Sequence, residues 1–237
     1  MEFNLAQIKE RWNYVLECLG NDFGLDAFLE TQYCGDFYEW EKYNGRVLAQ
    51  SLDYFDSKLY FSSGVSKACF FFENDDYVIK IPFVGVSISD AVNDYCELEE
   101  RNYELAKRNG YEDFFAETKF LMNYKYPEAD FEIPIYISVR ADVNQEIKAE
   151  IESVSWHDIS DPQPVRGEDE DEFWSLYEMN GIQFPAVKDY FVYKYGEKTL
   201  DGFWDFLYNS GINDLHMGNV GLIDDKPVFI DYSGFDG

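Results

Sequence analysis

The sequence predicts an α+β fold organised as one domain of two lobes. Short apolar runs separated by turn residues predict β-strands over residues 59–82 and again over 119–139. Helical spacing of apolar residues before and between these segments predicts helices, and a short hairpin is predicted near residues 220–230. Strands and helices segregated in this way are typical of the α+β class. Of the 237 residues, 46% are hydrophobic, which is enough for a substantial core.

The first predicted elements are a helix and a three-stranded meander. Residues 4–19 place apolar side chains at helical intervals, and Gly20 is a natural stop. The aromatic and acidic residues after it have no clear pattern, so residues 1–58 are expected to be a partly helical N-terminal extension. From Leu59, the segment LYFSSGVSKACFFFENDDYVIKIPF contains three apolar runs, divided by a small polar loop and an ENDD turn. The third run contains Lys80.

A long helix and two further strands complete a predicted N-terminal lobe of residues 59–139. Residues 89–109 have helical spacing, begin with Ser-Asp as N-cap candidates, and are followed by Gly110. Apolar runs at 119–124 and 133–139 predict the two strands.

The remaining residues, 140–237, are expected to form a reduced C-terminal lobe. An acidic stretch leads into an amphipathic helix in the second half of residues 168–181, and a further helix covers about 200–210. Two short apolar runs, Val220–Ile223 and Val228–Ile230, are separated by DDKP and predict a β-hairpin.

The charge of the chain limits its partners. The formal net charge is −28, so the surface repels nucleic acids and anionic membranes, and we expect neither to be bound directly. Free ATP is repelled as well, so a nucleotide site would need local cations and a metal ion. The four cysteines are widely spaced without a CxxC pair, no apolar run is long enough to span a bilayer, and the N-terminus lacks the features of a signal peptide. We therefore expect a cytoplasmic protein with reduced thiols.

Polar residues gather around the predicted hairpin. Asp214, His216 and Asn219 precede its first strand, and Asp231 follows its second. Because paired strands bring their ends together, the oxygen-bearing side chains of Asp214, Asn219 and Asp231 could converge at one end of the hairpin. Such a convergence suits a hard cation and a phosphate. His216 is interpreted as a structural residue that holds the loop.

The order and spacing of these residues resemble the protein-kinase-like superfamily over roughly residues 59–235. That family has an Asp followed five positions later by an Asn, then a hairpin that ends in a second Asp. Asp214, Asn219 and Asp231 match this pattern. The form D-L-H-x-x-N is more similar to aminoglycoside, choline and other small-molecule kinases than to the HRD form. The sequence YVIK, ending in Lys80, is similar to the third-strand lysine motif.

The resemblance implies a two-lobed protein-kinase-like fold that transfers the γ-phosphoryl group of ATP to a hydroxyl of a protein or small molecule. Asp214 would orient the attacking hydroxyl or accept its proton. Asn219 and Asp231 would hold Mg²⁺ through oxygen atoms.

In the N-terminal lobe, the resemblance implies that Lys80 contacts the phosphates of ATP and pairs with a helix glutamate. Glu100 is favoured among four candidates, the others being Glu97, Glu99 and Glu104. Strand alternation alone would instead predict an outward, solvated lysine. The polar loop between the first two strands would bind phosphate through backbone N–H groups, hydroxyls and an ammonium. Its residues are Ser63, Gly64, Ser66 and Lys67.

The sequence departs from the family pattern in three respects. The loop has one glycine, Gly64, where protein kinases usually have three, and Asp231 is followed by Tyr-Ser-Gly rather than Phe-Gly. Only six residues follow Asp231, so we expect no activation segment and a reduced C-terminal lobe. Small kinase-like proteins of this kind are similar to ones encoded by bacteria and their phages, in which case the host cytoplasm would be the site of action.

Two alternatives to a kinase remain open. The same residues could bind ATP in another orientation and transfer a nucleotidyl group. The strongly negative charge also fits an acidic binding or inhibitor protein, either a DNA mimic or a pseudokinase, that performs no catalysis.

Overall fold

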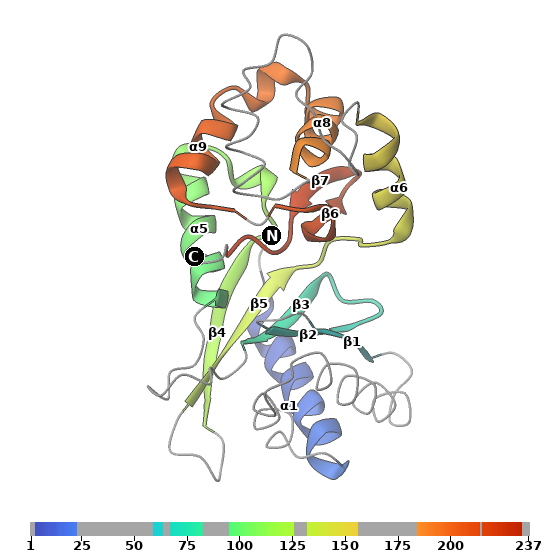
Figure 1. Ribbon diagram of the computed structural model, residues 1–237. Coiled ribbons are helices and arrows are strands. Elements are labelled where there is room, and N and C mark those ends of the chain that lie inside the picture. Colours follow the sequence, from blue (N-terminus) through green and yellow to red (C-terminus); the bar gives the residue numbers. More distant parts are fainter. Residues whose placement is uncertain are drawn as a thin grey trace, which may run out of the picture. The chain divides into compact units, whose positions relative to one another are not determined.

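The structure, a computed structural model, confirms the α+β class (Figure 1). It describes residues 3–22, 59–63, 67–82, 95–125, 132–155, 184–213 and 215–233. The chain divides into two compact units: unit 1 comprises Met1–Glu97 and Thr118–Arg140, and unit 2 comprises Leu98–Glu117 and Ala141–Gly237. The chain passes from unit 1 to unit 2 after Arg140, one residue from the predicted boundary between residues 139 and 140. Most of the helix predicted over residues 89–109, however, belongs to unit 2 rather than to the predicted N-terminal lobe.

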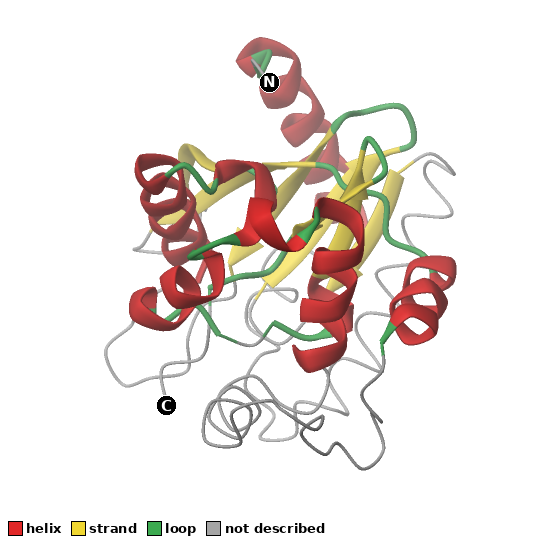
Figure 2. Cartoon of the chain, turned by 90° about the horizontal axis from the view of Figure 1, so that it is seen from above, coloured by secondary structure: helices red, strands yellow, loops and turns green. Residues whose placement is uncertain are grey.

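Unit 1 is built on a five-stranded antiparallel sheet, whose strands are among those drawn yellow in Figure 2. In chain order the strands are β1 (Leu59–Ser63), β2 (Lys67–Phe72), β3 (Tyr77–Pro82), β4 (Thr118–Lys125) and β5 (Glu132–Val139). Their order across the sheet is β1-β2-β3-β5-β4. All five strands lie where the apolar runs predict them. The structure adds one irregularity of register, between Phe120 and Met122 in β4.

The core of unit 1 lies between one face of this sheet and helix α1 (Leu5–Asp22). Ile8, Trp12 and Val15 of α1 are fully buried, at the helical spacing of i, i+4 and i+7. They cluster with strand residues Leu59, Ala68, Phe70, Phe72, Ile79, Ile81, Ile135 and Ile137. Because successive side chains of a strand point to opposite faces, the residues between these belong to the face away from α1.

Unit 2 combines helices with a two-stranded hairpin. Its helices are α5 (Tyr95–Asn109), which begins in unit 1, α6 (Gln145–Val154), α8 (Phe184–Tyr195) and α9 (Phe203–Ser210). Short 3₁₀ helices are η3 (Glu112–Phe114), η4 (Glu197–Leu200) and η5 (Met217–Asn219). The hairpin consists of β6 (Val220–Ile223) and β7 (Lys226–Phe229).

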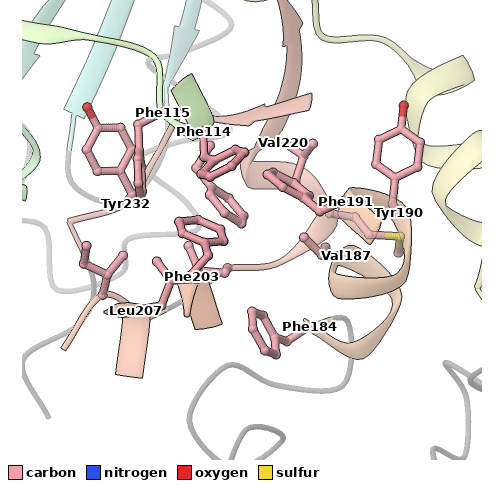
Figure 3. Close-up of a cluster of buried hydrophobic side chains, with 14 of the residues drawn as sticks. Phe114, Phe115, Phe184, Val187, Tyr190, Phe191, Phe203, Leu207, Val220 and Tyr232 are labelled. Carbon is pink, nitrogen blue, oxygen red and sulfur yellow. The ribbon is translucent and has the colours of Figure 1, made fainter. Parts of the chain in front are cut away.

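Aromatic side chains dominate the core of unit 2 (Figure 3). Phe191 of α8, Phe203 of α9 and Phe229 of β7 are each fully buried. The rings of Phe191 and Phe229 stack with centroids 4.6 Å apart, and those of Phe114 and Phe203 are 4.5 Å apart. Buried aromatic pairs add stabilisation beyond the area that they bury. The hairpin is therefore packed into a dense core rather than attached at the surface.

The structure contains two helices that the sequence analysis did not predict. Helix α6 begins after Asn144, whose side chain caps it by accepting a hydrogen bond from the backbone N–H of Ile147 at 2.9 Å. Helix α8 is buried on nearly every side. The predicted helix within residues 168–181, residues 89–94 of the predicted long helix and the segment 23–58 lie outside the described residues. Among the helices that are described, none combines the length and apolar character that crossing a membrane requires.

Candidate functional site

The hairpin brings Asn219 and the residues around Asp231 together, as the sequence predicts. Val220 pairs with Phe229, so Asn219 and Ile230 are the next residues at the open end. The backbone N–H of Ile230 donates to the carbonyl oxygen of Asn219 at 2.9 Å. The opposite end closes through Asp224 and Asp225, whose φ angles of 51° and 61° are those of a type I′ turn.

The loop before β6 is held by local hydrogen bonds. Nδ1 of His216 accepts from the backbone N–H of Gly218 at 3.0 Å, and the N–H of Asn219 donates to the carbonyl of His216 at 2.9 Å. Because Nδ1 is an acceptor, a neutral His216 carries its proton on Nε2. These bonds agree with a structural role for His216. Asn219 is 7% exposed, and Asp214 lies outside the described residues.

The backbone on the other side of Asp231 is also anchored. Tyr232 is fully buried, and its hydroxyl donates to the carbonyl oxygen of Ala116 at 2.7 Å. The N–H of Ala116 in turn donates to the carbonyl of Phe229 at 2.9 Å. The carbonyl of Tyr232 accepts from Nδ2 of Asn102, on helix α5, at 2.9 Å. Asp231 thus lies between two residues whose backbones are fixed.

Sequence reasoning missed Asn102 and Ala116. They are 130 and 116 residues from Tyr232, and nothing in the local sequence links such distant positions. The tyrosine that replaces phenylalanine after Asp231 was the one available signal, because a buried tyrosine hydroxyl requires a hydrogen-bond partner.

Asn219 and Asp231 offer ligand types that suit Mg²⁺. The carboxylate of Asp231 is half-buried, and its Oδ1 accepts a long hydrogen bond of 3.4 Å from Oγ of Ser233. Mg²⁺ is usually held by one or two protein carboxylates, with waters and substrate phosphates completing an octahedron. Within the described residues there is no group of three or more His, Cys, Asp or Glu side chains suited to a metal. One carboxylate and one amide oxygen therefore fit Mg²⁺ held jointly with a phosphate.

The surroundings of α5 and η3 are strongly acidic. Burial, followed by the negative charge of Glu117 and three further acidic residues, raises the pKa of Tyr103 to about 12. A phosphate in this part of unit 2 would be repelled without a cation to compensate.

In unit 1, Lys67 and Lys80 share the sheet face that lies away from α1. Lys80 pairs with Cys69 of β2 and Tyr136 of β5, and Lys67 pairs with Pro82. The two lysines are therefore diagonal neighbours on adjacent strands. Each is only 4% exposed, so the solvated-surface alternative for Lys80 is wrong. Two buried ammonium groups on one face make an environment that suits an anion.

The loop before Lys67 is only partly described. Ser63 is the last residue of β1, whereas Gly64 and Ser66 lie outside the described residues. The proposed backbone contacts of this loop with phosphate stay a prediction.

The four candidate glutamates on helix α5 differ in how deeply they are buried. Cys96, Glu99, Tyr103 and Ala106 are buried and form one stripe along the helix. Glu99 is fully buried within this stripe, whereas Glu100 is half-buried and Glu97 and Glu104 are exposed. The pairing of Glu100 with Lys80 stays a prediction.

No protein-family model matches the chain, and no curated protein has a matching sequence.

Proposed function

We propose that this protein is an ATP- and Mg²⁺-dependent phosphotransferase of the two-lobed protein-kinase-like type, acting on a protein or small-molecule hydroxyl. The observation that carries the proposal is the hydrogen bond of 2.9 Å between the N–H of Ile230 and the carbonyl of Asn219. This bond, with the anchored backbone of Tyr232, brings Asn219, which carries an amide, within one residue of Asp231, which carries a carboxylate, at the open end of the hairpin. The spacing of Asn219 and Asp231 in the sequence supports the same reading.

Unit 1 provides the second line of support. A lysine on the third strand of an antiparallel sheet, on the face away from the covering helix and buried, has the features expected of a phosphate-contacting lysine. Lys80 would contact the phosphates with Lys67 nearby, and Glu100 would hold its ammonium.

The proposed chemistry is in-line transfer of one phosphoryl group. A bond forms between the acceptor oxygen and the γ-phosphorus, while the bond to the oxygen bridging the β- and γ-phosphates breaks. Asp214 would orient the acceptor hydroxyl and take its proton. Asn219 and Asp231 would hold Mg²⁺, which when bound neutralises phosphate charge.

The proposal is tested by thermal melts with ATP, in the presence of Mg²⁺ or of a chelator. A ligand that binds only the folded state raises the melting temperature, so ATP with Mg²⁺ should stabilise the protein and ATP with chelator should not. Asp231→Asn should remove most of this shift. Asp225→Asn is the matched control, because it also removes one carboxylate but lies at the far end of the hairpin. No Mg²⁺-dependent shift in the wild type at millimolar ATP would overturn the proposal.

Labelled ATP separates the alternatives. Transfer of label from the γ-phosphate to an acceptor in total lysate supports a kinase, and transfer from the α-phosphate supports nucleotidyl transfer. The net charge of −28 favours the acidic binding protein as the second candidate, either a DNA mimic or a pseudokinase. That candidate predicts transfer from neither position.

A further inference from the structure

A well-formed hydrogen bond connects helix α5 to the segment that carries Asp231. Nδ2 of Asn102 donates to the carbonyl oxygen of Tyr232 at 2.9 Å, across 130 residues of sequence. The acceptor is a carbonyl, so the amide NH₂ group is the only part of the Asn102 side chain that can make this bond. Asn109, on the same helix, instead donates to the carbonyl of Leu105 at 2.8 Å and so bonds within its own helix.

The bond of Asn102 restrains the peptide between Tyr232 and Ser233, one residue beyond Asp231. On the preceding side, the N–H of Ile230 is bonded to the carbonyl of Asn219. The chain is thus held at the peptide between Phe229 and Ile230 and again at the peptide between Tyr232 and Ser233, with Asp231 in the short span between them. Because this span is anchored at both ends, the backbone limits the directions in which the carboxylate of Asp231 can project. Removing the bond to Asn102 releases one of these two anchors and leaves the carboxylate group itself chemically unaltered.

We propose that Asn102 is a positioning residue for the metal-binding carboxylate of Asp231. It acts through the carbonyl of Tyr232 and touches neither metal nor nucleotide. This assignment rests on the proposed function, since it presumes that Asp231 binds Mg²⁺. Groups that orient a metal ligand from outside the coordination sphere typically change metal affinity or activity by about 10–100-fold when removed.

The test is a titration of MgCl₂ at fixed ATP, followed by the melting temperature and by the rate of phosphoryl transfer. Asn102→Ala is compared with Asn109→Ala, which removes a side-chain amide from the same helix and gains the same helix propensity. Asn102→Ala should require about tenfold more Mg²⁺ to reach half of its maximal ATP-dependent shift, by the magnitude given above. Asn109→Ala should keep the wild-type midpoint.

A second variant covers the case in which Asn102→Ala does not fold. Asn102→Asp keeps the shape of the side chain but replaces the amide donor by an oxygen that repels the carbonyl of Tyr232. Its added negative charge would by itself strengthen Mg²⁺ binding, so a higher Mg²⁺ requirement in this variant again supports positioning.

Two outcomes would overturn the assignment, and they are distinguishable. If the wild type shows the Mg²⁺-dependent shift but the Asn102 variants only melt at a lower temperature, with an unchanged Mg²⁺ midpoint, Asn102 is merely structural. In that case the phosphotransferase proposal stands. If the wild type itself shows no Mg²⁺-dependent shift, both proposals fail together.

Discussion

Gly221 of β6 occupies a position with no room for a side chain, and its replacement tests how tightly the hairpin is packed. A Cβ atom added there would lie 2.7 Å from Cβ of Ala141, 3.1 Å from the carbonyl oxygen of Asp142 and 3.3 Å from Cγ2 of Ile230. The first two neighbours belong to a segment that Leu222 holds through two backbone hydrogen bonds with Asp142, of 2.8 and 2.9 Å. Relief of the clash therefore requires movement of backbone.

The expected cost of Gly221→Ala follows from these contacts. Overpacking a buried site by one methyl group typically costs about 1–3 kcal/mol. Weakening one of the two hydrogen bonds to Asp142 adds about 1 kcal/mol to this cost. Alanine also lowers the conformational entropy of the unfolded chain, which stabilises the folded state by about 0.5–1 kcal/mol and offsets part of the cost. The net loss is about 1–3.5 kcal/mol, or a fall of roughly 2–14 °C in melting temperature for a chain of this size.

Calorimetry and urea denaturation measure this loss, and a double mutant isolates its cause. Ala141→Gly removes the atom 2.7 Å from the new Cβ, so it should recover part of the stability that Gly221→Ala loses. A Gly221→Ala protein within about 0.5 kcal/mol of the wild type, the range of an ordinary surface substitution, would refute this reasoning. Absence of any rescue by Ala141→Gly would show that the methyl contact is not the cause.

Three further predictions concern other parts of the molecule. Lys80→Met keeps the apolar stem of a buried side chain but removes its charge, so it should lower ATP-dependent thermal stabilisation; an unchanged shift would contradict a phosphate contact. In Gly218→Ala the new Cβ would lie 2.8 Å from Cε1 of His216, so the ring should lose its bond to the Gly218 N–H, and unchanged imidazole NMR shifts would count against this. The hydrogen bond from Lys194 is the largest of the causes that lower the pKa of Glu150 below its ordinary value of 4.5. The ionised carboxylate of Glu150 therefore stabilises the folded protein above about pH 4.5, and this stabilisation is lost as the pH falls below that value. Lys194→Met should flatten the stability profile in that acidic range, and an identical profile would argue against the ion pair.

The elements that could be predicted from the sequence are strands that form short apolar runs bounded by turn residues, and helices whose apolar residues recur at helical spacing. In β2, residues 68–72 are apolar throughout and an ENDD turn follows them, so the strand could be predicted even though the different burial of Phe70 and Phe71 could not. Helix α8 could not be found in this way, because residues such as Phe184, Val187 and Tyr190 bury nearly its whole circumference and leave no polar face to define a period. Helix α6 did carry a local signal, the capping Asn144.

For the site, local spacing was informative and long-range contacts were not. Asn219 and Asp231 are brought together by a short hairpin, so their separation in sequence suffices to predict their proximity. The bond from Asn102 depends on tertiary packing, which local sequence does not encode. The different burial of Glu99 and Glu100 follows from the phase of α5, because adjacent residues on a helix differ by about 100° in direction.

The way the chain alternates between the two units has a consequence for its synthesis. The backbone crosses from one unit to the other three times, after Glu97, after Glu117 and after Arg140, so neither unit is a continuous stretch of sequence. On the ribosome, α1 emerges early, but the sheet it covers is incomplete until β5 has been made. A fragment that begins at residue 98 would carry β4 and β5 without the rest of their sheet and would expose Ile135 and Ile137, which are fully buried in the whole protein. The two halves are thus expected to fold well only together, and attempts to express either alone should yield aggregates.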